Sequence, residues 1–214
     1  MNGLLTLVAI GFAAGLALAI PVGPMAIMLI NTTVAKGWRH GVVGALAMAT
    51  VDGLYAVSVF YIGGALANWL KVWSLWLSLG GSAILLFLGI ATLVKNLALF
   101  KTKDEDVTPT KPETSRRKTF ATFFAATVVN PPTALYFLAL APSVSSIATD
   151  GNAFAGVVFA IGVFVGSIVW QESLAVAGLA LRSITRGKLR AWIGALGGVL
   201  IIALAITMAV RAMT

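Results

Sequence analysis

The chain has 214 residues, of which 59% are hydrophobic and 10% charged, and its mean hydropathy of +0.98 is that of an integral membrane protein. The absence of cysteine excludes disulfides, thiol redox chemistry and cysteine metal sites, and the single histidine argues against a histidine-rich metal site. The net charge of +8 does not indicate nucleic acid as a partner, because the basic residues gather in loops between apolar segments.

The first apolar segment covers residues 4–34 and is interrupted at Pro21-Val22-Gly23-Pro24. Ala17-Leu18-Ala19 resembles a signal-peptidase site, but no Lys or Arg precedes it and the apolar run continues beyond it. We therefore expect a retained first helix. Proline has no backbone N–H and disrupts the preceding helical turn, so this helix should be broken at its proline pair.

Five further segments have the length that a bilayer span needs, about 20 residues. They cover residues 42–63, 74–94, 119–140, 154–181 and 189–210. The segment 119–140 is broken at Asn130-Pro131-Pro132, in the same way as the first. Residues 98–118 form the one polar linker, and their mixture of charged residues, Pro and Thr predicts disorder.

The loops that follow the first, third and fifth segments carry all but two of the 15 Lys and Arg residues. The two exceptions, Lys71 and Arg211, lie on the opposite side. The positive-inside rule then places the basic loops, including the linker, in the cytoplasm and both termini outside. The basic residues are Lys36, Arg39, Lys95, Lys101, Lys103, Lys111, Arg116, Arg117, Lys118, Arg182, Arg186, Lys188 and Arg190.

The linker divides the chain into two halves, residues 1–97 and 119–214, with three spans in each. Because three is odd, the halves enter the membrane with opposite orientation. Each half opens with a proline-broken helix, and this pattern is typical of transporters whose interrupted helices mark a binding site near the midplane. The sequence therefore predicts an all-α integral membrane protein with six transmembrane helices in two inverted three-helix repeats, with helices 1 and 4 broken at Pro motifs.

Only two of the seven acidic residues, Asp52 and Glu172, lie inside apolar segments, one in the second span of each half. An Asp at a helix centre costs about 2.5–3.5 kcal/mol to insert, and such residues usually face a cavity, a relay or a substrate path. No Lys or Arg lies deep enough in any span to neutralise them. Each is therefore protonated or matched by something from outside the chain. The alternative is that both are permanently protonated and hydrogen-bonded between helices.

The two broken helices expose helix ends at membrane depth, which are tolerated only beside protein or a wet cavity. Helix N-termini favour a carboxylate and C-termini favour a cation, and an amino-acid zwitterion presents both groups. The alternative, prolines that only kink packed helices, is disfavoured by two breaks at matching positions. Gly-xxx-Gly spacings predict close packing between helices of the same chain, at Gly11/Gly15, Gly37/Gly41, Gly162/Gly166 and Gly194/Gly198.

Pro21-Val22-Gly23-Pro24, followed by Gly37, Gly41 and Asp52, resembles the first-half signature of the LysE/RhtB amino-acid exporters. Val129-Asn130-Pro131 resembles the Asn-Pro motif of that family, and Trp170 falls where its lysine exporters tend to have an aromatic residue. The resemblance implies a homodimeric exporter of amino acids or close relatives in the inner membrane, driven by the proton motive force. Carried over by position, the residues of its transport path are Gly23, Pro24, Asp52, Asn130 and Pro131.

We therefore expect no enzyme and no cofactor, but an exporter that exchanges protons for an amino acid by alternating access in the bacterial cytoplasmic membrane. Asp52 and Glu172 are the expected proton-coupling residues, although Glu172 has no match in the family pattern. The expected substrate-binding residues are Pro21, Gly23, Pro24, Asp52, Asn130, Pro131, Trp170 and Glu172.

Two other functions stay open. Two carboxylates with free backbone carbonyls would also suit a hard inorganic cation, which makes a cation exporter the first alternative. The second is a membrane-embedded enzyme or assembly factor, although no Ser/His/Asp set, metal motif or phosphate loop occurs in the sequence.

Overall fold

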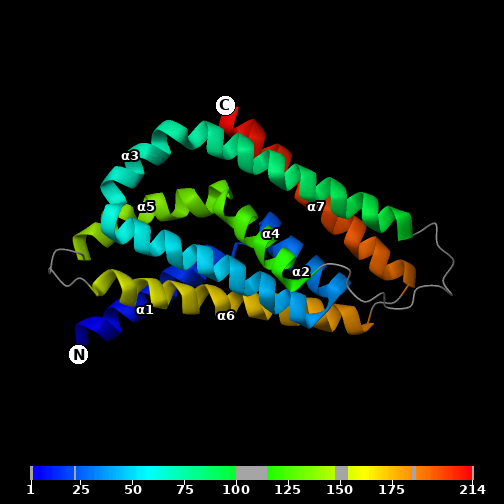
Figure 1. Cartoon of the computed structure of the whole chain (residues 1–214), viewed down its shortest axis with the longest axis horizontal. Helices are drawn as coiled ribbons and strands as arrows, with labels where there is room; N and C mark the ends of the chain where they lie inside the picture. Colours follow the sequence, from blue (N-terminus) through cyan, green and yellow to red (C-terminus); the bar gives the residue numbers. More distant parts are fainter. Residues whose placement is uncertain (1, 22, 100–114, 148–153, 185–186, 214) are drawn as a thin grey trace.

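The computed structural model describes residues 2–21, 23–99, 115–147, 154–184 and 187–213, and Figure 1 shows the whole chain. Helices are the only regular elements in these ranges. Figure 1 shows them packed side by side with their long axes running largely along the longest axis of the molecule. Their bounds are α1 (Asn2–Ala19), α2 (Pro24–Lys36), α3 (Trp38–Leu99), α4 (Arg116–Val128), α5 (Pro131–Ile147), α6 (Ala155–Ile184) and α7 (Gly187–Met213).

Four stretches are long and apolar enough to cross a membrane singly: Trp38–Gly63, Ser78–Ala98, Ala155–Ser183 and Ala191–Arg211. Two helix pairs, α1 with α2 and α4 with α5, pass the same test together, and each pair is bent by more than 40° at a short break. The chain therefore has four candidate spans, or six if each bent pair is one span. This confirms the all-α membrane class, whereas the two inverted repeats remain a prediction.

The helix α3 contains both of the spans expected over residues 42–63 and 74–94, as the candidate spans Trp38–Gly63 and Ser78–Ala98, which are joined across a kink. It continues from Trp38 to Leu99 and has one residue with non-helical dihedral angles, Ile62 (φ −128°, ψ 21°). Figure 1 shows that α3 folds back on itself at the left of the view, so that its two ends lie together at the right-hand end of the bundle. The two candidate spans within α3, Trp38–Gly63 and Ser78–Ala98, therefore run in opposite directions.

The break between α1 and α2 is followed by a helix start that proline favours. Pro24 occupies the first turn of α2, where its missing N–H costs no hydrogen bond. At the other end, α2 stops at Gly37, whose φ of 93° favours glycine and whose N–H bonds to the carbonyl of Thr33. Arg182 of α6 also donates to the Thr33 and Val34 carbonyls, at 3.5 and 3.3 Å. The end of α2 is thus tied to the second half of the chain.

Glycines allow α1 and α6 to approach to backbone contact. A Cβ atom added to Gly15 would meet the carbonyl oxygen of Val163, and one added to Gly166 would meet that of Phe12. Gly11 and Gly162 are confined in the same way. Two of the Gly-xxx-Gly pairs therefore pack against each other within one chain, as the sequence predicts.

Two apolar clusters form the core, and the chain passes from one to the other along a single face of α3. Met48 belongs to the cluster around Leu29 and Phe123, and Ala56 belongs to the cluster around Phe137. Asp52 lies between these two positions, one helical turn from each, and is only 3% exposed. The buried carboxylate therefore sits at the junction of the two clusters.

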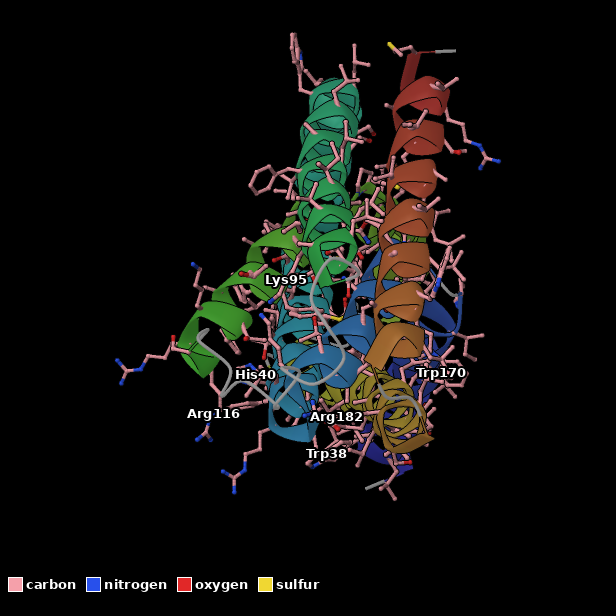
Figure 2. All side chains as sticks on the ribbon, turned by 90° about the vertical axis from the view of Figure 1, so that its right-hand side faces the viewer. Trp38, His40, Lys95, Arg116, Trp170 and Arg182 are labelled. Carbon is pink, nitrogen blue, oxygen red and sulfur yellow. The ribbon has the colours of Figure 1, made fainter. Side chains whose placement is uncertain are left out.

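Basic residues from separate loops converge at one end of the bundle. Lys36 lies within electrostatic reach of Lys95 and Lys118, although these residues come from three different helices. Figure 2 looks onto this end and shows Lys95 together with Arg116 and Arg182. Five of the residues that the sequence assigns to one basic side thus lie at one end of the bundle: Lys36, Lys95, Arg116, Lys118 and Arg182. The orientation of that side in a membrane remains a prediction.

Candidate functional site

A cavity of about 400 Å³ lies where the two bent helix pairs meet, and every helix contributes to its lining. The first break contributes Pro21, Gly23 and Pro24, and the second contributes Asn130 and Pro132. Both proline breaks therefore border one cavity, as their matched positions predict. Asp52 of α3 lines it as well.

Five of the eight predicted binding residues line this cavity, and three do not. Pro131, Trp170 and Glu172 are absent from the lining, whereas their chain neighbours Pro132 and Gln171 are present. Successive residues of a helix point about 100° apart, so the face of α6 that presents Gln171 to the cavity turns the residues on either side of it away. A role of these three in substrate binding remains a prediction that the geometry of the cavity does not favour.

Among the described residues Asp52 has one hydrogen-bond partner, Ser167 of α6, whose Oγ donates to Oδ2 of the carboxyl group at 2.6 Å. Within the described residues no Lys, Arg or His forms an ion pair with it. The bond joins the second span of the first half to the middle of α6, across 115 residues of sequence. A carboxyl group held by a hydroxyl on one side and open to a cavity on the other can accept a proton or a cation that enters the cavity.

The end of α4 at the second break is satisfied by partners from outside the helix. The N–H groups of Val129 and Asn130 bond to the carbonyls of Ala125 and Thr127. The carbonyl of Val128 accepts a hydrogen bond from the hydroxyl of Tyr55 at 2.7 Å. Such bonds replace the intrahelical partners that the last carbonyls of a helix lack.

We expect Tyr55→Phe to destabilise the protein by about 1–3 kcal/mol, because it leaves the Val128 carbonyl without its donor. The ring itself keeps its stacking on Phe137, at a centroid distance of 5.6 Å. The measurement is thermal unfolding of the purified protein in detergent. Tyr136→Phe is the matched control, since the Tyr136 hydroxyl bonds to Ala14 inside α1, where the helix supplies its own donor. Equal losses in the two variants would contradict the capping role of Tyr55.

Two buried amide residues that line the cavity, Asn130 and Gln171, have unpaired oxygen atoms. Asn130 donates from Nδ2 to Thr133 Oγ1 at 2.9 Å, while its Oδ1 has no partner among the described residues. Gln171 Oε1 likewise has no hydrogen-bond partner among the described residues. Both residues are more than nine-tenths buried, and an unpaired buried acceptor costs about 1–3 kcal/mol. The two amides and Asp52 therefore favour a molecule in the cavity that donates hydrogen bonds.

The start of α2 supplies the opposite chemistry. Its first intrahelical bond runs from Ile27 N–H to the Gly23 carbonyl at 3.2 Å, and Gly23 provides no side-chain cap. The N–H groups of Met25 and Ala26 precede this bond, so the helix leaves them without an internal partner. Both residues line the cavity, which therefore contains the positive end of a helix dipole.

The sequence analysis did not select several polar residues that the structure places at the site, among them Ser167, Gln171, Thr207 and Arg211. Gln171 and Ser167 are polar positions of an otherwise apolar helix, and only the packing of α6 shows which of them faces Asp52 or the cavity. Thr207 and Arg211 of α7 line the cavity too. For Arg211 a signal was present, because it is one of only two basic residues on the predicted outer side.

A helical membrane protein with a cavity between two broken helices, a buried carboxyl group and open helix ends has the features of a transporter. The chain belongs to the LysE type translocator family, which matches residues 16–212. It is also 28% identical over 190 residues to a protein of Bacillus subtilis (strain 168) named "Putative amino acid efflux protein YcgF", covering 86% of each chain. No solved structure matches the chain. The family predicted from the two proline motifs is thus confirmed.

Proposed function

We propose that this protein exports amino acids or close relatives across the bacterial cytoplasmic membrane, driven by the proton motive force. The observation that carries the proposal is the cavity that both proline breaks line together with Asp52, a buried carboxyl group without a basic partner in the described residues. Membership of a translocator family and the name of the related Bacillus subtilis protein support an amino acid as the cargo.

In this mechanism Asp52 exchanges a proton for the ammonium group of the substrate. The protonated carboxyl group is neutral and tolerates the empty cavity, whereas the charged form requires a cation beside it. Asp52 holds either a proton or the substrate, but not both at the same time. Because one replaces the other, the proton and the substrate cross the membrane in opposite directions. Glu172 is the second predicted proton site, and its position outside the cavity lining makes it the weaker candidate.

Alternating access would come from movement of one half of the chain against the other. The bent pair α1–α2 packs against α6, the second span of the other half, and the bent pair α4–α5 packs against α3, which contains the second and third spans of the other half. Packing of each broken helix against the other half is the arrangement expected of two inverted repeats, residues 1–97 and 119–214, around a shared site. The homodimer that the family resemblance implies is a further prediction.

Counterflow in proteoliposomes tests the proposed function. Vesicles with purified protein would be given a panel of labelled amino acids, with and without an imposed pH gradient, and divalent cations would be tested in the same vesicles. We expect exchange of at least one amino acid and its acceleration by the gradient. Movement of divalent cations without any amino acid would instead support the inorganic-cation exporter.

The predicted orientation can be tested by cysteine labelling, which is clean because the chain has no native cysteine. Thr108→Cys lies in the linker, outside the described residues, and should react only when the reagent reaches the cytoplasm. Thr149→Cys, in the loop between α5 and α6 and also outside the described residues, should react from the outer side of intact cells. The reverse result for the two positions would show that the orientation is wrong.

A further inference from the structure

The helix α7 presents one continuous face to the cavity. Leu204, Thr207, Met208 and Arg211 all line it, and their spacing of three, four and seven residues places them on the same side of a helix. This face therefore runs from an apolar residue to a guanidinium group over about 10 Å of helix. Neither proline motif includes any part of it.

Arg211 and Asp52 are the only charged side chains among the described residues that line the cavity. They carry opposite charges and lie on different helices, α7 and α3. No ion pair joins them in the described part of the chain, so each keeps its capacity to bind a charged group. A bare inorganic cation would be attracted by one of them and repelled by the other, whereas a molecule with both charges satisfies the two.

A guanidinium group recognises a carboxylate particularly well, because its N–H groups match the two oxygens in a planar, two-point contact. Met25 and Ala26 at the start of α2 line the same cavity, and their N–H groups, which have no partner among the described residues, add donors for an anion. The acceptors, in contrast, are Asp52 and the unpaired oxygens of Asn130 and Gln171. The cavity thus has separate groups for the two ends of a zwitterion.

On the side of α2, α3 and α7, apart from Asp52, Thr207 and Arg211, the lining is apolar and includes three methionines, Met25, Met48 and Met208. Methionine side chains are flexible and adapt to apolar groups of different shape. Asp52 is the only acidic residue in the described lining, and it is needed for the substrate ammonium. A second positive charge on the substrate would therefore meet no carboxylate.

We infer that Arg211 binds the carboxylate of the substrate and that the cavity selects neutral α-amino acids with apolar side chains. The inference rests on the proposed function and specifies its substrate class. The volume of about 400 Å³ lies in the usual range of small-molecule sites, about 300–1,000 Å³. The selection excludes basic amino acids and amines that lack a carboxylate.

The experiment compares leucine, leucinamide and lysine as competitors of labelled leucine in counterflow. In the wild type, leucinamide should compete at least about tenfold more weakly than leucine, the loss expected when a charge-assisted hydrogen bond is missing. Lysine should also compete at least about tenfold more weakly, because its second ammonium group would lose water without gaining a carboxylate partner. Arg211→Gln should weaken competition by leucine to a similar extent and should make leucine and leucinamide nearly equal. Arg211→Lys, which keeps the charge, should restore part of the difference.

Lys71→Gln is the matched control, because it removes the only other basic residue on the predicted outer side. It should leave the ratio of leucine to leucinamide unchanged. Arg211→Gln protein should remain monodisperse, since the arginine is exposed near the end of α7. If Arg211→Gln keeps the wild-type ratio, or if lysine competes better than leucine, the inference is wrong while amino-acid export stands. If the wild type exchanges no amino acid at all, the proposed function fails and the inference fails with it.

Discussion

Asp52→Asn should remain folded and lose nearly all export that a pH gradient drives. The amide has almost the shape of the carboxyl group and avoids the cost of a buried charge. Its oxygen can still accept the hydrogen bond from Ser167, so the contact between α3 and α6 is kept. What the amide cannot do is release and rebind a proton. The measurement is efflux from substrate-loaded vesicles at several external pH values, with protein amounts matched.

The control for this variant is Glu172→Gln, which makes the same chemical change at the other intramembrane carboxyl group. Glu172 lies outside the cavity lining, so export should fall less and should keep its dependence on pH. Counterflow without a gradient adds a second readout, because it separates loss of coupling from loss of binding. Wild-type export by Asp52→Asn, with the same pH dependence, would show that Asp52 is structural and that the proposed coupling is wrong.

Gly81→Ala should destabilise the protein by about 1–3 kcal/mol, the usual cost of overpacking, and should greatly reduce transport. A Cβ atom at this position would meet the carbonyl oxygen of Val129 and would lie 2.9 Å from Cδ of Pro131. A backbone carbonyl and a proline ring cannot move aside as a flexible side chain can. The second break would therefore have to shift, and with it the part of the cavity that Asn130 lines.

The neighbouring glycine provides a sharp control for this prediction. A Cβ atom at Gly80 would have no heavy atom within 4 Å, and the residue lies in the same helix, α3. Gly80→Ala should leave both stability and transport close to wild type, because alanine is at least as good a helix former as glycine. Thermal unfolding in detergent and counterflow give the two readouts. Equal behaviour of the two alanine variants would mean that close packing at the second break is not important.

The membrane class, the positions of the candidate spans and the two helix breaks could all be predicted from the sequence, because they depend on local properties. A run of about 20 apolar residues has few alternatives to a membrane helix, and a pair of prolines beside Gly or Asn inside such a run favours a helix break followed by a new helix start. Asp52 was found for a similar reason, since a charge inside an apolar run is costly in any arrangement of helices. The resemblance to the family rests on the same short motifs.

The tertiary structure alone shows what these elements contact. Ser167 is 115 residues from Asp52, and no local pattern selects it as the partner. On α6 the family resemblance favoured Trp170 and the charge inside an apolar segment favoured Glu172, whereas the rotation of the helix presents Gln171 to the cavity. Arg211 counted in the sequence only as a charge near the C-terminus, and the packing of α7 makes it part of the cavity. Hydropathy and proline chemistry thus determine where the helices lie and break, but the face that each helix turns inward depends on side-chain packing between distant segments.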